Sequence, residues 1–295
     1  MQVCGDALRS ARLRVFLAIA LAGLGVQLAA PAAHAAGGGL DEVDIYDCPA
    51  TIPANSVGVL MNDVECSTGT ADFPKYGIVV GKNSQLALNG HTLSYVPSPS
   101  TDGTVLCVKA CTVFDGMMTS PGGGAAVHVN GRGKLTVFAL DITGFDYGLF
   151  AAQSAVNVSN TSITATVGGI WYTGPTTLDH VDVNPYAGAT SLQCVDAASH
   201  SGKVQGHDVA VSGCLFGVYG ARGVTLKNLT VTNSFTGVFS ERKITLTDSS
   251  VTGSSPLSAD IYGGSRPKLT NTTCGTSLRF FGKTGSGNWG VCAGD

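Results

Sequence analysis

The chain has 295 residues, of which 40 are glycine, 44% are hydrophobic and only 13% are charged, and its formal net charge is −3. This composition excludes an intrinsically disordered chain, and the slightly acidic balance argues against a nucleic-acid partner. It favours a single glycine-rich body with a sizeable apolar core.

Residues 1–35 are predicted to be a signal peptide. A stretch with three arginines, residues 9–14, precedes the apolar run Val15 to Ala30, which ends in the small-residue cleavage pattern Ala33-His34-Ala35. The run is short for a membrane span, and no second apolar run follows it. We therefore expect a secreted or periplasmic protein without a membrane span. Loss of three arginines and one aspartate with this leader moves the formal charge from −3 to −5.

The cysteines predict disulfides. Eight remain after the leader, and an even number in an exported chain is typical of a disulfide framework, whereas the C-x-x-C pairs that bind zinc are lacking. Several pairings are open to eight cysteines. We predict the pairing between nearest neighbours in sequence: Cys48 with Cys66, Cys107 with Cys111, Cys194 with Cys214, and Cys274 with Cys292.

From residue 77 onward a short phrase recurs every twenty to twenty-six residues: a small residue, an apolar residue, any residue, and a second apolar residue. Short alternating strands repeated at this interval cannot bury a face alone and must stack on their neighbours. The repeat therefore predicts an all-β parallel solenoid of about nine coils. The phrases start at Gly77, Gly103, Ala126, Gly148, Gly169, Ser191, Gly217, Gly237 and Asp260.

The third residue of each phrase is expected to point outward, because its apolar neighbours point inward. Five of the nine outward residues are aromatic, which favours a platform on which sugar rings stack. Alternatively, the C-terminal segment Phe280 to Trp289 covers this face. The outward residues are Val79, Val105, His128, Phe150, Trp171, Gln193, Tyr219, Phe239 and Tyr262.

A basic column is expected where the first strand of each coil ends. Lysine and arginine there would bind a carboxylated or sulfated glycan, with arginine forming bidentate bonds to carboxylates. Alternatively, these side chains are only solvated strand ends that prevent edge pairing. The column reads Lys82, Lys109, Arg132, Gln153, Gly174, Asp196, Arg222, Arg242 and Arg266.

A polar column marks a later bend of each coil. Asparagine and aspartate tolerate the left-handed backbone of a sharp bend, so we expect a structural ladder of stacked side chains, with His91 and His207 one residue beside it. We expect no metal site at Asp179-His180-Val181-Asp182, because alternation in a strand points His180 away from Asp179 and places Asp182 beyond the bend. The column comprises Asn160, His180, Asp208, Asn228, Asp248 and Asn271.

The entry into the repeat resembles a known family. The stretch from Cys48 through Cys66 to Gly77-Ile-Val-Val, followed by the segment from Leu86 to Leu93, is similar to the opening coils of exported bacterial members of the pectin-lyase-like superfamily. The resemblance covers Cys48 to about Cys274 and implies a right-handed parallel β-helix over residues 77–273, with an N-terminal cap (36–76) and a C-terminal cap (274–295). It also implies recognition, cleavage or epimerisation of acidic polysaccharides, although the superfamily includes adhesins and proteins without known activity.

The residue types of the first-strand face favour β-elimination over hydrolysis. The paired aspartates of the superfamily's polygalacturonases are absent, although Asp102 and Asp146 lie two coils apart. Elimination needs a cation beside the uronate carboxylate, a base and an acid. Lys109, His128, Arg132 and Tyr147 supply these types on three successive coils. The Trp-Ile-Asp-His phrase of pectate lyases is absent, so no metal is assigned, but calcium could bind Asp102, Asp146 and backbone oxygens.

The sequence thus predicts a monomeric exported protein that acts on or binds an acidic polysaccharide. The expected activity is that of a lyase or an epimerase-like enzyme, and the alternative is a non-catalytic glycan-binding or surface adhesion module. The residues expected to bind the polysaccharide are Phe150, Trp171, Tyr219, Phe239, Tyr262, Arg222 and Arg242.

Overall fold

The computed structural model describes residues 40–67, 76–96, 103–186, 189, 192–199, 201–255, 258–280 and 287–295. Contacts divide the chain into residues 1–36 and residues 37–295, and every described residue belongs to the second unit. The predicted signal peptide, residues 1–35, lies outside the described residues.

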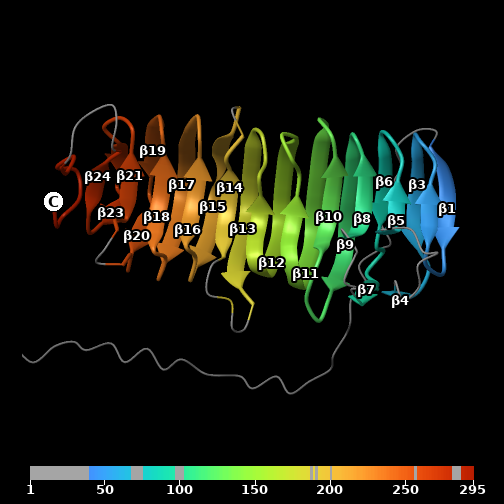
Figure 1. The fold of residues 1–295 in the computed structure, drawn as a ribbon. Helices are drawn as coiled ribbons and strands as arrows, with labels where there is room; N and C mark the ends of the chain where they lie inside the picture. The colour runs from blue at the N-terminus through green and yellow to red at the C-terminus, as the bar shows by residue number, and fades with distance from the viewer. Residues whose placement is uncertain are drawn as a thin grey trace, which may run out of the picture. The chain divides into compact units, whose positions relative to one another are not determined.

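The second unit is a parallel β-helix (Figure 1). The described residues form 24 strands and no helix, and every strand pairs in parallel with strands on adjoining coils. The predicted all-β parallel solenoid is therefore confirmed. The strands are β1 (Asp41–Ile45), β2 (Ala50–Ile52), β3 (Ser56–Leu60), β4 (Val64–Ser67), β5 (Tyr76–Val80), β6 (Ser84–Ala87), β7 (Thr92–Val96), β8 (Gly103–Val108), β9 (Cys111–Thr119), β10 (Ala125–Asn130), β11 (Lys134–Phe150), β12 (Ala155–Trp171), β13 (Thr176–Pro185), β14 (Gln193–Ala197), β15 (Lys203–Ser212), β16 (Phe216–Gly220), β17 (Gly223–Thr232), β18 (Thr236–Ser240), β19 (Lys243–Thr247), β20 (Ser250–Thr252), β21 (Ile261–Gly263), β22 (Lys268–Thr270), β23 (Thr273–Cys274) and β24 (Ser277–Arg279).

The first strand of each coil contributes one aliphatic side chain to a continuous inward column. These side chains lie opposite one another in register and are fully buried, so the column forms part of the solenoid's core. Stacking aliphatic side chains on those of the adjoining coils buries a face that one coil cannot bury alone. The column comprises Ile78, Val105, Val127, Leu149, Ile170, Val195, Val218, Val238 and Ile261.

This register corrects two positions of the predicted outward row. Val105 points inward, because it pairs with Ile78, and Leu106 takes the outward position beside Val79. Gln193 lies opposite Phe216, before the inward residue, so Asp196 takes the outward position instead. Both errors come from phrases whose starting residue was placed one or three positions early.

The parallel ladder extends past residues 77 and 273 at both ends. Strands β2, β3 and β4 pair with β5, β6 and β7, and β24 pairs with β21. Residues assigned from the sequence to the two caps therefore continue the stack of coils.

The four predicted disulfides are confirmed. The joined pairs are Cys48–Cys66, Cys107–Cys111, Cys194–Cys214 and Cys274–Cys292, with Cα–Cα distances of 5.3, 5.8, 5.8 and 5.0 Å. Four disulfides are compatible with an extracellular or periplasmic location. Among the described residues there is no helix of the length and apolarity needed to cross a membrane.

The predicted bend column adopts the left-handed backbone. Its members, from Asn160 to Asn271, have φ between 47° and 53°. Two ladder bonds follow the solenoid axis: the Asn228 amide donates to Asp208 Oδ1 at 2.8 Å, and the Asn271 amide donates to Asp248 Oδ1 at 3.0 Å. These two bonds support the structural interpretation of the column for the pairs Asp208–Asn228 and Asp248–Asn271.

Candidate functional site

The outward positions of the first strands line one face of the solenoid. We call these residues the aromatic row, because five of them carry aromatic rings. They alternate with the buried aliphatic column along each strand and follow one another in register from coil to coil. The aromatic row comprises Val79, Leu106, His128, Phe150, Trp171, Asp196, Tyr219, Phe239, Tyr262 and Leu278.

In the N-terminal half of the aromatic row the rings form a contiguous cluster. The rings of His128 and Phe150 are 4.8 Å apart, and those of Phe150 and Trp171 are 5.1 Å apart. The ring of Tyr147, which precedes Phe150 on the same strand, lies 4.8 Å from the ring of Trp171. Polar bonds fix the orientation of this cluster: Tyr76 OH is 2.9 Å from His128 Nδ1, and Trp171 Nε1 donates to Gln193 Oε1 at 3.2 Å.

In the C-terminal half the rings stack on one another and meet the end of the chain. Tyr219 stacks on Phe239 at 4.8 Å, and Phe239 stacks on Tyr262 at 5.3 Å. Phe280 packs 5.4 Å from Phe239 and 5.8 Å from Tyr262. The alternative that the C-terminal segment covers the aromatic row is therefore right for Phe239 and Tyr262.

Asp196 separates the two halves. It is only 4% exposed, and Oδ1 has no hydrogen-bond partner among the described residues. Burial raises the pKa of this carboxyl group to about 6. A buried acid with a raised pKa, placed between Trp171 and Tyr219, is a typical mark of a functional site.

Tyr219 of the aromatic row and Tyr147 beside the row are held in the protonated form. Burial, followed by the charge of Glu241, raises the pKa of Tyr219 to about 12, and Tyr219 OH donates to Glu241 Oε1 at 3.1 Å. Burial, followed by the charge of Asp146, also raises the pKa of Tyr147. Both hydroxyl groups can therefore donate hydrogen bonds at neutral pH.

The predicted basic residues lie in the turns that follow the first strands. All six are exposed to solvent, and Arg132 Nε donates to Gln153 Oε1 on the next coil at 3.2 Å. Asp196, which the sequence placed in this column, belongs to the aromatic row instead. We call the six residues the basic row: Lys82, Lys109, Arg132, Arg222, Arg242 and Arg266.

The four residues predicted to catalyse β-elimination fall into two places. His128 and Tyr147 both pack against Phe150, with centroid distances of 4.8 and 5.7 Å. Lys109 and Arg132 lie in the exposed turns after β8 and β10. Of the proposed calcium ligands, Asp102 lies outside the described residues, and Asp146 Oδ1 accepts a hydrogen bond from Thr166 Oγ1 at 2.7 Å.

Sequence reasoning missed Asp196 as a site residue. The signal was present: if Cys194, rather than Ser191, is aligned with the glycine of the next phrase, Asp196 falls opposite Tyr219. Cysteine occupies that small-residue position here, and its sulfur is joined to Cys214.

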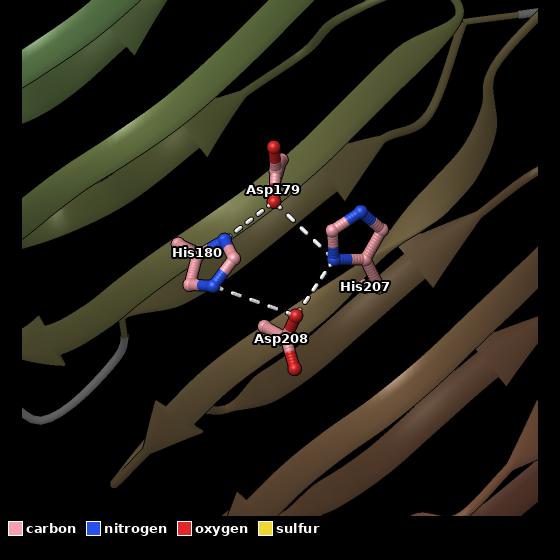
Figure 2. Close-up of side chains that lie close together, drawn as sticks. All are labelled: Asp179, His180, His207 and Asp208. Atoms are coloured by element: carbon pink, nitrogen blue, oxygen red, sulfur yellow. Dashed lines mark hydrogen bonds and ion pairs between the residues drawn. The ribbon is translucent and has the colours of Figure 1, made fainter.

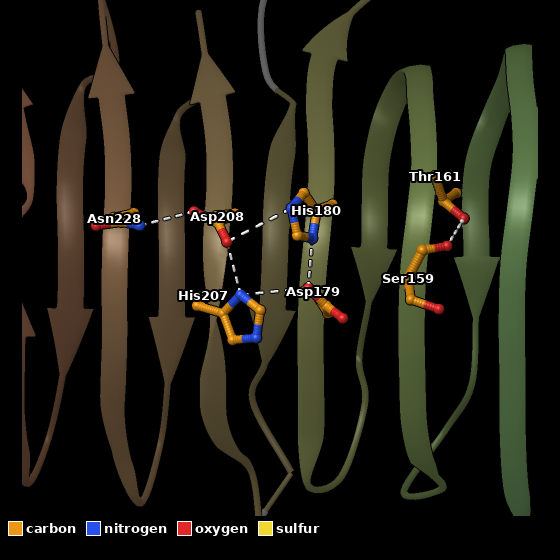
Figure 3. A network of polar contacts seen from close by, with 7 residues as sticks. All are labelled: Ser159, Thr161, Asp179, His180, His207, Asp208 and Asn228. Carbon is orange, nitrogen blue, oxygen red and sulfur yellow. Dashed lines mark hydrogen bonds and ion pairs between the residues drawn. The ribbon is translucent and has the colours of Figure 1, made fainter.

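A second polar cluster lies at the bend column. Asp179 and His180 on β13 meet His207 and Asp208 on β15 (Figure 2). The expectation that His180 points away from Asp179 is wrong, because the left-handed φ of 53° at His180 turns its ring back to Asp179 Oδ1 at 2.6 Å. The cluster continues through Asp208 to the Asn228 amide (Figure 3).

These contacts shift two of the cluster's ionisation equilibria. The hydrogen bond to Asp179 raises the pKa of His180. Hydrogen bonds from Asn228 and His207 lower the pKa of Asp208. Both shifts favour the charged form of the group concerned.

Comparison with protein families, with curated proteins and with solved structures found no match to this chain. The parallel β-helix is therefore established by the strand register alone, and membership of the pectin-lyase-like superfamily stays a prediction.

Proposed function

We propose that this protein binds an acidic polysaccharide on the aromatic row. The observation that carries the proposal is the register of the row, which places Phe150, Trp171, Tyr219, Phe239 and Tyr262 on one face. Phe280 packs on the last two rings, so the proposal rests on Phe150, Trp171 and Tyr219. The C–H faces of sugar rings pack on aromatic rings as on any apolar surface. Neighbouring first strands are about 4.8 Å apart, so the row offers ring contacts along the length of a polymer.

The basic row supports an acidic ligand. Its lysine and arginine side chains are exposed in turns that border the aromatic row, where carboxylate or sulfate groups of a bound chain would meet them. Arginine binds carboxylates through two parallel hydrogen bonds. An acidic glycan matches this combination of rings and cations better than a neutral one.

The proposal extends to the setting in which the protein works. We infer a monomer that is exported to the periplasm or secreted, and a distant relation to the pectin-lyase-like superfamily. The leader sequence, the four disulfides and the parallel β-helix support these inferences.

Replacing Trp171 with alanine should weaken binding of polygalacturonate, alginate or hyaluronan about tenfold, because one desolvated ring contact is worth about 1 kcal/mol or more. Isothermal titration calorimetry on the purified protein would measure this loss. Tyr46→Ala is the matched control, since Tyr46 is 61% exposed and lies outside the row. Equal affinities of Trp171→Ala and the wild type for every polymer would contradict the proposal.

A lyase or epimerase-like enzyme is the second candidate, and Asp196 favours it. In β-elimination a base removes the C5 proton, the C4–O bond breaks as the C4=C5 double bond forms, and an acid protonates the leaving oxygen. Asp196, with its pKa raised to about 6, can exchange a proton near neutral pH, and His128 is the sequence-predicted alternative. Ultraviolet absorbance of the unsaturated uronate would detect turnover, measured with and without calcium. Asp196→Asn and His128→Ala separate the two assignments.

A further inference from the structure

The polar cluster at the bend column has an alternating arrangement. In the parallel register Asp179 lies opposite His207, and His180 lies opposite Asp208. Each carboxylate therefore has one imidazole beside it on its own strand and another across the coil boundary (Figure 2). This two-by-two arrangement adjoins the ladder bond between Asp208 and Asn228, with which it shares Asp208 (Figure 3).

The ligand groups lie close enough together to meet at one small cation. His180 can offer one nitrogen, either Nδ1, which is 2.6 Å from Asp179 Oδ1, or Nε2, which is 3.6 Å from Asp208 Oδ2. His207 Nδ1 is 3.2 Å from Asp179 Oδ1 and 2.7 Å from Asp208 Oδ2. With one ligand atom from each residue, all four atoms lie within 4.8 Å of one another. A tetrahedral ion with bonds of about 2.0–2.1 Å needs its ligands about 3.3 Å apart.

In this cluster each imidazole bonds the carboxylate on its own strand, His180 Nδ1 to Asp179 Oδ1 at 2.6 Å and His207 Nδ1 to Asp208 Oδ2 at 2.7 Å. His207 Nδ1 also lies 3.2 Å from Asp179 Oδ1, so both carboxylates converge on one nitrogen that carries at most one proton. A cation between the side chains would replace these bonds and bind one atom from each of the four residues. The two aspartates would neutralise its charge.

The cluster is open to an incoming ion. The side chains of His180 and His207 are 60% and 50% exposed. Beside them a shallow groove of about 420 Å³ is lined by His180 and Asp182 of the same coil and by Asp141 and Asn160 of the coils before it. Rotation of these side chains can bring one ligand atom from each residue to a single ion, since the four atoms already lie within 4.8 Å of one another.

We propose that Asp179, His180, His207 and Asp208 form a zinc site that joins β13 to β15. Two imidazoles and two carboxylates are the ligand types that zinc accepts. Calcium takes six to eight oxygen ligands and does not fit a site with two nitrogen ligands. The site is independent of the aromatic row and of any glycan.

Titration of the purified protein with zinc, followed by calorimetry, should show one saturable site, and calcium should not compete for it. His180→Asn removes the imidazole but keeps a residue that tolerates the left-handed backbone, since Asn160 and Asn228 adopt this conformation at the same bend position on other coils. His207→Thr copies Thr247, which occupies the corresponding position two coils later. Each variant should bind zinc at least about tenfold more weakly. The visible spectrum of the Co²⁺-loaded protein should be that of a tetrahedral site and should be lost in both.

His91→Asn is the matched control, because His91 lies 3.5 Å from a single carboxylate, that of Asp63. This replacement should leave the zinc affinity unchanged. Circular dichroism would test whether each variant is folded. If one of the histidine variants does not fold, Asp179→Asn would be used in its place. Wild-type zinc affinity in His180→Asn and His207→Thr, an equal loss in His91→Asn, or the absence of a saturable site in the wild type would each overturn the proposal.

Discussion

Replacing Asp196 with asparagine is expected to raise the free energy of unfolding by about 3 kcal/mol at pH 8 and to leave it nearly unchanged at pH 3. The folded state holds the pKa of Asp196 at about 6, against 3.8 for the ordinary group. The folded protein therefore binds more protons than the unfolded chain between these values. The contribution of Asp196 to stability is therefore greatest below pH 3.8 and is lost as the pH rises through 6. Asparagine does not titrate, so the variant should not show this loss.

Urea unfolding of both proteins at several pH values between 3 and 8 would measure the difference. Glu42→Gln is a suitable control, since Glu42 is exposed and its replacement should change stability by less than about 0.5 kcal/mol at any pH. If the stability of Asp196→Asn follows that of the wild type across this range, the carboxyl group is not held neutral by burial. A gain in stability that accompanies loss of function would be typical of a functional residue that strains its surroundings.

Gly206→Ala should lower the free energy of unfolding by about 3 kcal/mol or more. Gly206 has φ of +144°, and a β-carbon at this position would overlap the carbonyl oxygen of Leu178 on the previous coil. Leu178 and Leu226 occupy the corresponding inward positions on either side, so the backbone at Gly206 lies where neighbouring coils place a leucine. To accommodate the alanine methyl group, either the two coils must move apart or the substituted strand must lose its pairing with the previous coil.

Gly131→Ala measures the cost of a positive φ in the absence of steric overlap with a neighbouring coil. Gly131 also has positive φ, 79°, but nothing lies within 4 Å of a β-carbon there. Its replacement should cost only about 1–2 kcal/mol, the price of the left-handed backbone. Similar losses for the two variants, measured by thermal unfolding, would show that close approach of the coils at Gly206 is unimportant.

The sequence was sufficient for the parts of the fold that depend on periodicity. Aliphatic residues at a fixed place in each coil, such as Ile78 and Val127, predict the stacked strands, because only stacking buries them. Cysteines close in sequence predict the disulfides, because residues of the same coil or of adjoining coils lie close together in space.

The parts that could not be predicted depend on departures from that periodicity. Twenty-five residues separate Ile170 from its partner Val195, whereas twenty separate Val218 from Val238, so simple counting misplaced Asp196. At His180 the left-handed backbone breaks the rule that successive side chains alternate between faces, and the polar cluster exists because of that break. Neither irregularity has a strong signal in a single sequence.

The in-register stacking of the first strands also bears on how such a surface can evolve. Phe216 lies opposite Thr236, so residues 216–235 make one complete coil with one ring of the aromatic row. Duplication of that segment would insert a whole coil, preserve the pairing on both sides, and lengthen the face by about 4.8 Å. The length of the face that a linear polymer can contact can therefore change by whole coils through unequal recombination. No loop needs to be redesigned.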